Sequence, residues 1–262
     1  MNSKLVDIGV NLGNPRFNAD RDEVLRRAME AGVTRMILTG TDVQESAQMM
    51  ALAEHHPGFL WSTSGVHPHD ASSCDESTIE SLRALASSPC VVAIGECGLD
   101  FNRDFSPRAI QERWFEAQVA LSLELEMPLF LHERDASERF LSILDGFQAD
   151  SPKGVVHCFT GEREALFAYL DRGLYIGVTG WVCDERRGQG LQELVKDIPL
   201  DRILVESDAP YLAPRDMRPR PKRNEPAFLV HIVEVLASHM GCETEALIQA
   251  SSDNAERLFG LL

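Results

Sequence analysis

The chain has 262 residues, the usual length of one α/β barrel, so we expect a single domain spanning residues 1–262. Its 41 acidic residues outnumber its 25 basic residues and give a formal net charge of −16, which excludes a broad basic surface for nucleic acid. Hydrophobic residues at 44% and charged residues at 25% are those of an ordinary folded domain and exclude disordered and fibrous classes.

Eight short apolar runs alternate with longer amphipathic segments along the chain, the pattern of repeated strand–helix units. The runs expected to be strands are LVDIGV from Leu5, RMILTG from Arg35, LWSTSGV from Leu60, VVAIGE from Val91, PLFLH from Pro128, GVVH from Gly154, YIGVTG from Tyr175 and ILVES from Ile203. Several are apolar at nearly every position, as parallel strands covered on both faces require. The spacing of apolar residues predicts helices over residues 20–31 and 111–125.

Eight such units predict a closed (β/α)8 barrel, an α/β fold. A doubly wound open sheet is the alternative, but it would need a Gly-rich phosphate turn after the first strand, and DIGVNLGN lacks the G-x-G-x-x-G spacing. A Pro/Arg-rich loop, Ala209 to Pro226, follows the last strand, and two further helices end in NAERLFGLL. No apolar stretch approaches eighteen residues and the N-terminus lacks a signal-like apolar run, so we expect a cytoplasmic protein without a membrane span.

Barrel enzymes build their sites at the carboxyl ends of the strands, so polar residues that follow the apolar runs are the candidates. They are Asp7, Asn11, His67, His69, Glu96, His132, His157 and Asp208. Imidazoles and carboxylates that converge on one rim are metal-ligand types. We expect a metal ion there, with Asp208 orienting or deprotonating a water molecule. Cys97 and Cys158 follow Glu96 and His157, and we interpret both as buried thiols.

An acidic protein that binds nucleic acid needs local basic groups, because phosphate neutralisation dominates affinity. The segment from Arg215 to Arg223 has five basic residues around one acid, and Arg103 and Arg134 follow rim motifs. The alternative is a solvated loop whose arginines pair with surface acids. Three aromatic side chains, Phe101, Trp181 and Tyr211, also fall in loops after rim motifs and are candidates for base stacking or for local packing.

Several motifs together resemble the TatD family of metal-dependent deoxyribonucleases. They are SGVHPHD at 64–70, AIGECGLDFNRD at 93–104, LHERDA at 131–136, HCFTG at 157–161, ESDAPYL at 206–212 and RNEP at 223–226. The resemblance implies an amidohydrolase-like barrel, a divalent ion such as Mg²⁺ with Mn²⁺ or Zn²⁺ as alternatives, and phosphodiester hydrolysis. Matched by motif, the metal ligands would be Glu96, His132, His157 and Asp208.

One departure from the family pattern concerns the first strand. Most members carry an H-x-H pair there, whereas this chain has Asp7-Ile8-Gly9 followed by Val10-Asn11, so two histidine ligands are missing. We expect a weaker or vacant second metal position. The opening DIGVN, with GECGLDFNRD and GWVCDERRG, is similar to the branch described as 3′→5′ exonucleases on single-stranded DNA and RNA, with a role in DNA repair or nucleic acid degradation.

The resemblance thus implies an exonuclease that takes ends of single-stranded DNA and RNA, and we expect it to be a monomer. His67, Arg134, Tyr211 and Arg223 are the candidates for substrate contact. For His67 there are two interpretations, contact with a phosphate or leaving group, and bracing of the metal-binding carboxylates. The alternative functions are a metal-dependent amidohydrolase or esterase acting on a small molecule, and a binding protein without metal.

Overall fold

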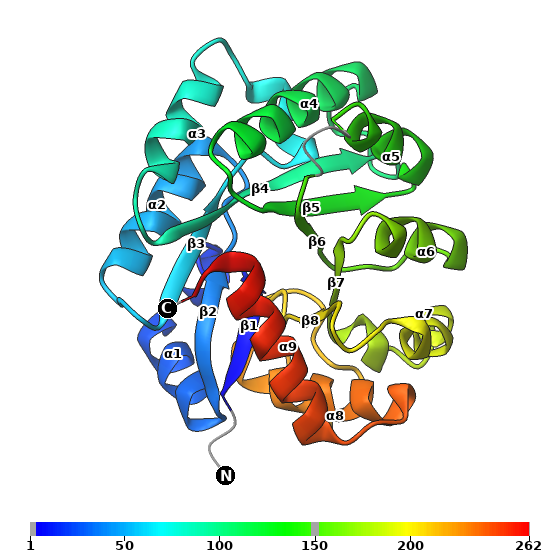
Figure 1. The fold of residues 1–262 in the computed structure, drawn as a ribbon. Coiled ribbons are helices and arrows are strands. Elements are labelled where there is room, and N and C mark those ends of the chain that lie inside the picture. Colours follow the sequence, from blue (N-terminus) through cyan, green and yellow to red (C-terminus); the bar gives the residue numbers. More distant parts are fainter. Residues whose placement is uncertain (1–3, 148–151, 262) are drawn as a thin grey trace.

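A computed structural model describes residues 4–147 and 152–261, so the expected domain limits at residues 1 and 262 lie outside the described residues. Eight parallel strands form one sheet in sequence order, β1 to β8 (Figure 1). They are β1 Leu5–Val10, β2 Val33–Leu38, β3 Leu60–Ser64, β4 Val91–Asp100, β5 Leu129–Arg134, β6 Gly154–Val156, β7 Tyr175–Val178 and β8 Ile203–Val205. The predicted barrel and all eight predicted strands are confirmed.

The barrel closes through residues at the ends of its first and last strands. A parallel bridge joins Val10 to Ala209, and the amide of Asn11 donates to the carbonyl of Ala209 at 2.8 Å. The amide of Asp208 donates to the carbonyl of Gly9 at 2.9 Å. The segment after β8 is thereby fixed against the carboxyl end of β1.

Helices cover the outside of the sheet. They are α1 Arg21–Glu30, α2 Val43–Glu54, α3 Thr78–Ala86, α4 Arg108–Glu124, α5 Ser137–Asp145, α6 Arg163–Asp171, α7 Gln189–Leu194, α8 Leu229–Met240 and α9 Thr244–Phe259. Short 3₁₀ turns are η1 Pro15–Phe17, η2 Pro68–Ser73, η3 Gly180–Cys183, η4 Val195–Asp197 and η5 Pro226–Phe228. The two helices predicted from spacing correspond to α1 and α4, and the two predicted after the Pro/Arg-rich loop are α8 and α9.

Only β1 has its predicted bounds, and the ends of the other strands differ from the prediction by one to four residues; the differences at β4 and β8 bear most on the site. β4 continues past Glu96 to Asp100, because β5 keeps pairing with it as far as Arg134. β8 ends at Val205, before the predicted end at Ser207, and its last ladder partner is Val178. The chain turns away soon afterwards, where Asp208 adopts a positive φ of 52°.

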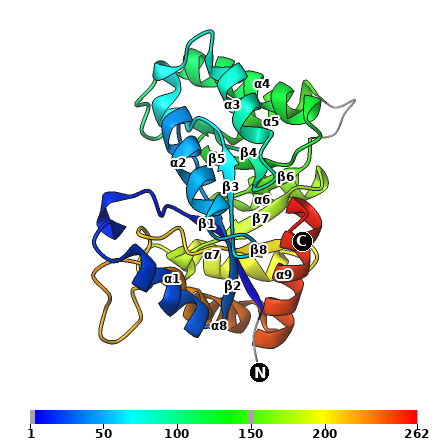
Figure 2. The same cartoon turned by 90° about the vertical axis from the view of Figure 1, so that its left-hand side faces the viewer.

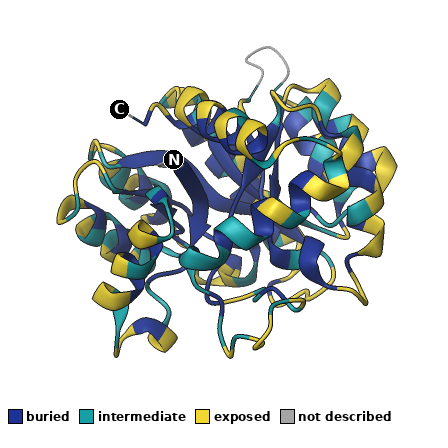
Figure 3. Cartoon of the chain, turned by 90° about the horizontal axis from the view of Figure 1, so that it is seen from below, coloured by how far each residue is buried: buried dark blue, intermediate teal, exposed yellow. Residues whose placement is uncertain are grey.

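Two hydrophobic clusters hold the barrel together. The smaller one fills its interior with residues such as Ile8, Phe130 and Leu204, and Phe259 of α9 joins it. The larger one lies between the strands and the surrounding helices and includes Cys97, as its predicted outward direction requires. Figure 3 shows the result, with strands buried and the outer faces of the helices exposed.

Strand alternation places polar groups directly above the apolar interior. Phe130, Val155 and Leu204 are buried in the inner cluster. His132, His157 and Glu206 each lie two residues further along the chain. Because side chains two residues apart on a strand point to the same face, these three also point to the inner side. The candidate residues therefore gather at the carboxyl end of the barrel.

Candidate metal centre

A pocket of about 600 Å³ opens at the carboxyl end of the barrel. Its lining includes all four residues matched to the family's metal ligands: Glu96, His132, His157 and Asp208. Three of the four candidates for substrate contact, His67, Arg134 and Tyr211, line it as well. The fourth, Arg223, is not among the described residues of the lining.

Three imidazoles surround one carboxylate oxygen at the centre of this pocket. Oε1 of Glu96 lies 2.8 Å from Nε2 of His157, 3.0 Å from Nδ1 of His132 and 3.3 Å from Nε2 of His67. Burial by itself would raise the pKa of Glu96, but the neighbouring imidazoles, His157 first, hold it well below its ordinary value. Glu96 is thus kept as a carboxylate, the form that binds a cation.

His67 braces this carboxylate. Its Nδ1 accepts a hydrogen bond from the amide of His69 at 3.1 Å, so Nδ1 carries no proton. In a neutral imidazole the proton then resides on Nε2, which faces Glu96. Burial lowers the pKa of His67 to about 4 and so favours the neutral form. This geometry fits the bracing interpretation of His67 rather than contact with a phosphate or leaving group, because its Nε2 faces the Glu96 carboxylate.

Glu206 orients His157 from the opposite side. Its Oε2 lies 3.2 Å from Nδ1 of His157, and its Oε1 accepts from the amide of Cys158 at 2.5 Å. Burial opposes a charge on His157, but Glu96 and Glu206 outweigh it and raise the pKa of this imidazole well above its ordinary value. A carboxylate behind a histidine fixes which ring nitrogen faces a metal, here Nε2.

Asp208 is held by the first strand. Its Oδ1 accepts from Nδ2 of Asn11 at 2.8 Å, in the segment where most family members have the H-x-H pair. Burial raises the pKa of Asp208 to about 7. Its φ of 52° and the 47° of Cys158 are left-handed values that cost a side-chain-bearing residue conformational energy and that concentrate at functional sites.

A second carboxylate, Asp100, supports the outer histidines. Its Oδ2 lies 2.6 Å from Nε2 of His69 and 3.4 Å from Nε2 of His132. The latter nitrogen is buried and has no hydrogen-bond partner among the described residues. Burial raises the pKa of Asp100, but the neighbouring imidazoles of His132 and His69 bring it below its ordinary value. An unpartnered imidazole nitrogen beside two ionised carboxylates fits a site for a divalent cation.

The missing H-x-H pair has a structural counterpart. A Cβ atom at Gly9 would lie 2.5 Å from Oε2 of Glu206, and one at Gly177 would lie 2.6 Å from Oε1. The Glu206 carboxylate thus fills the space that a side chain at position 9 would need. Asp7 does not face the pocket lining, because its Oδ1 accepts from the amides of Ser207 at 2.8 Å and Gly9 at 3.3 Å.

The basic segment from Arg215 to Arg223 divides into two parts. Arg223 turns inward: it donates to Asp20, to Glu225 and to the carbonyl of Arg16, and its guanidinium lies 4.8 Å from the ring centroid of Phe17. Its predicted contact with substrate is not supported, since these internal partners occupy its donors. Arg218 and Arg220 are exposed in the loop that projects from the molecule in Figure 2, gold to orange in colour.

The aromatic candidates also separate. Tyr211 lines the pocket, is 49% exposed and accepts from Nδ2 of Asn14 at 2.9 Å. Phe101 and Trp181 pack against the core, with Arg108 4.4 Å from the first ring and Arg187 4.5 Å from the second. Sequence reasoning missed Phe105, which lines the pocket and is 67% exposed. The available signal was an aromatic residue directly after the motif at 93–104.

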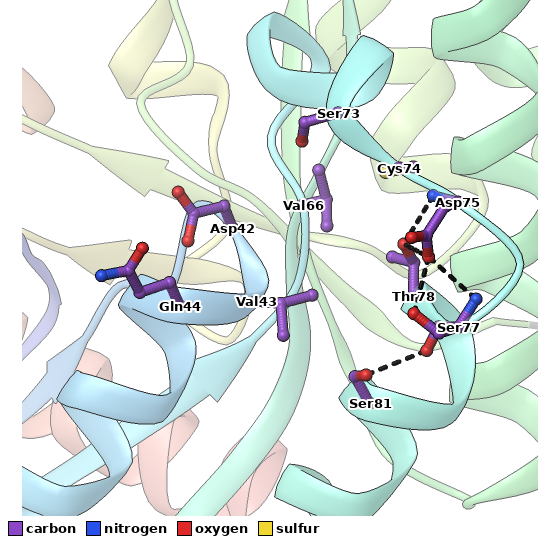
Figure 4. Close-up of a pocket in the computed structure, with 10 residues that line it drawn as sticks. All are labelled: Asp42, Val43, Gln44, Val66, Ser73, Cys74, Asp75, Ser77, Thr78 and Ser81. Atoms are coloured by element: carbon purple, nitrogen blue, oxygen red, sulfur yellow. Dashed lines mark hydrogen bonds between the residues drawn. The ribbon is translucent and has the colours of Figure 1, made fainter.

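A smaller pocket beside the barrel offers different chemistry. It lies between the start of α2 and the start of α3, and none of the ten described residues that line it is basic or a histidine (Figure 4). Asp75 accepts from Ser77 at 2.7 Å, and Thr78 accepts from the Asp75 amide at 2.9 Å. Because this lining offers no histidine and no cation, the rim pocket is the stronger candidate site.

The family profile described as TatD related DNase matches residues 6–260. The chain belongs to the TatD family. Relatives named 3′-5′ ssDNA/RNA exonuclease TatD include one from Pantoea ananatis, 54% identical over 98% of this chain and 100% of its own, and one from Erwinia billingiae, 56% identical over 98% and 99%. The family assignment predicted from the motifs is confirmed.

Solved structures agree with the fold. A TatD homologue from Escherichia coli has a TM-score of 0.90, 27% sequence identity and 99% coverage of both chains. A TatD family hydrolase from Entamoeba histolytica has a TM-score of 0.89 and 25% identity over the full length of both chains.

In the described part of the chain studied, no helix is long and apolar enough to cross a membrane.

Proposed function

We propose that this protein is a metal-dependent exonuclease that removes nucleotides from the 3′ ends of single-stranded DNA and RNA. The observation that carries the proposal is the convergence of three imidazoles on the Glu96 carboxylate, beside Asp208, in a pocket at the catalytic end of the barrel. Relatives more than half identical over nearly the whole chain are named as such exonucleases, which supports the substrate and the direction.

The ion would be held by Glu96, His132, His157 and Asp208. Two carboxylates and two imidazoles suit Mg²⁺ or Mn²⁺, with Zn²⁺ as an alternative. When bound, a divalent ion polarises a phosphoryl oxygen and makes water a stronger nucleophile. Because Glu206 occupies the space beside Gly9 and Asn11 is engaged with Asp208, we expect one tightly bound ion at the rim.

The protein's own groups would orient the attack. Asn11 fixes Oδ1 of Asp208 and leaves the other carboxylate oxygen to accept a proton from the attacking water. His67 would hold Glu96 in place by its contact at 3.3 Å, and Glu206 would hold His157 by a hydrogen bond. The barrel strands fix these groups, so little rearrangement is needed when substrate arrives.

Single-strand selectivity would follow from the scarcity of cationic contacts. Arg103 and Arg134 line the pocket, and Arg134 donates to Thr160 at 2.8 Å from a position on its wall. Phe105 and Tyr211 offer rings on which unpaired bases can stack. The net charge of −16 over the whole chain disfavours binding of a duplex, whereas a strand end needs only a few phosphate contacts.

The test uses purified protein and a single-stranded oligonucleotide labelled at its 5′ end, with the matching duplex as a control. Stepwise shortening in Mg²⁺, loss of activity with a chelator and recovery on adding Mg²⁺ are expected. Asp208→Asn should abolish shortening, whereas Asp201→Asn, an exposed acid on the opposite end of β8, should leave it unchanged. Shortening that persists in chelator would refute the proposal.

A further inference from the structure

A second group of metal-binding side chains lies apart from the rim pocket. The Cys183 thiol, an Asp216 carboxylate oxygen and an imidazole nitrogen of His231 are all within 4.8 Å of one another. His231 Nε2 is 2.9 Å from Asp216 Oδ1. None of the three belongs to the described lining of the rim pocket.

Three separate elements supply these residues. Cys183 ends η3, Asp216 lies in the loop between β8 and η5, and His231 lies in the first turn of α8, which packs against η3. Cys183 is 3% exposed, whereas the side chains of Asp216 and His231 are 37% and 30% exposed. The group therefore has a buried sulfur at its base and two ligands that remain open to solvent.

We propose that Cys183, Asp216 and His231 bind a Zn²⁺ ion that fastens the β8–η5 loop to α8 and η3. Ligand atoms of tetrahedral zinc, with bonds of about 2.0 to 2.3 Å, lie roughly 3.3 to 3.8 Å apart. Asp216 Oδ1 and His231 Nε2 are already 2.9 Å apart, and the other separations do not exceed 4.8 Å. Shifts of about 1 Å in the two exposed side chains would bring the three atoms into this range. A water molecule on the open side would complete four ligands.

The charges and ligand types at this group favour Zn²⁺ over Mg²⁺. Burial, followed by the charge of Asp216, raises the pKa of the Cys183 thiol, so without an ion the sulfur stays protonated. On binding, the thiol releases its proton to solvent, and thiolate and carboxylate together balance the charge of a divalent cation. Mg²⁺ avoids thiolate, so the two sites would hold different ions.

This site would act on the loop that carries Arg218 and Arg220. Arg215, the residue before Asp216, lies 3.4 Å from Asp184 and from Glu185, so the anchor would adjoin an existing ion-pair cluster. With the ion bound, the loop would be fixed at Asp216, just before the exposed Arg218 and Arg220. The proposal does not depend on the exonuclease activity.

Cobalt substitution tests the site, because a cobalt–thiolate bond gives a charge-transfer band in the near ultraviolet that oxygen and nitrogen ligands do not give. Full-length protein freed of metal should develop this band with Co²⁺ and lose it on adding Zn²⁺. Cys183→Ser should abolish the band, and His231→Ala should weaken cobalt binding at least tenfold. His231 is on the surface, so its variant stays informative if Cys183→Ser folds poorly.

Two matched variants separate this site from its alternatives. His239→Ala removes an exposed histidine from the same helix, and Cys158→Ser removes the thiol that lines the rim pocket. Both should keep the band and the cobalt affinity of the unmodified protein. Absence of the band in the unmodified protein, its survival in Cys183→Ser, or its loss in Cys158→Ser would overturn the proposal.

Discussion

The carboxylate of Glu206 provides the sharpest test of how the metal centre is built. Glu206→Gln keeps the shape of the side chain, and the amide oxygen can still accept from the Cys158 amide. The amide nitrogen then faces Nδ1 of His157, where a carboxylate oxygen now lies at 3.2 Å. Two donors cannot face each other, so the imidazole proton would move to Nε2, the nitrogen that faces Glu96 at 2.8 Å.

The expected consequence is weaker metal binding without loss of the fold. Removing a carboxylate that supports a metal-binding histidine costs about 10- to 100-fold in affinity, or roughly 1.4 to 2.7 kcal/mol. Because Glu206 and His157 are both buried and the change also blocks the ligating nitrogen, we expect the upper end of this range. The variant should destabilise the ion-bound protein and leave the stability of the metal-free protein unchanged.

Calorimetric titration with Mg²⁺, together with thermal unfolding of the metal-free protein, would measure both effects. Glu133→Gln is the matched control, because Glu133 follows His132 on β5 but accepts from the Ala136 amide and the Tyr169 hydroxyl at 2.7 Å each. Unchanged Mg²⁺ affinity in Glu206→Gln would refute the proposed role of this carboxylate.

Four further predictions concern substrate contact and stability. Phe105→Ala should raise KM about 5- to 100-fold, as loss of one stacked base does, with an unchanged melting temperature. Arg134→Ala should reduce the slope of log affinity against log salt by about 0.7, the effect of one phosphate contact on a single strand. Arg223→Ala should leave that slope unchanged and lower the free energy of unfolding by about 1 to 3 kcal/mol, because its charged partners are internal. Burial raises the pKa of Asp7 to about 8 from an unfolded value of 3.8. Its contribution to stability is therefore fully present below pH 3.8 and is lost as the pH rises to about 8. Asp7→Asn should make the free energy of unfolding, measured by chemical denaturation, less dependent on pH over this range.

The sequence was sufficient to predict the barrel because its strands are apolar on both faces. The runs that contain Phe130 and Val155 alternate inward and outward, and this alternation also places His132 and His157 on the inner side. The direction of a side chain can therefore be predicted along a regular strand and for the residue directly after it. For the same reason Cys97, one residue out of phase, was correctly predicted to face away from the barrel interior. The prediction that Cys158 is also buried was wrong, because it follows the end of β6, is only partly buried and lines the rim pocket.

Loop residues were harder to predict, because their direction depends on partners that are distant in sequence. Arg223 turns inward because Asp20 lies beside it, 203 positions away in the chain. No local pattern in a Pro-rich segment distinguishes such an arginine from the exposed Arg218 and Arg220. The pairing of His231 with Asp216 likewise arises only when α8 packs near the loop after β8.

The role of Glu206 was invisible for a related reason. Its position next to Asp208 indicated only another rim carboxylate. Its contact with His157 and the space it fills beside Gly9 and Gly177 come from three different strands. The reason for a glycine at position 9 becomes clear only when the structure shows that Glu206 occupies the adjacent space.

The most direct test of the central claim is a Mg²⁺ titration of metal-free protein in which calorimetry and exonuclease rate are followed on the same sample. We predict one tight ion per chain, a rate that rises with the same midpoint, and loss of both in Glu96→Gln. Two equally tight ions, or full activity before any ion is bound, would contradict the account.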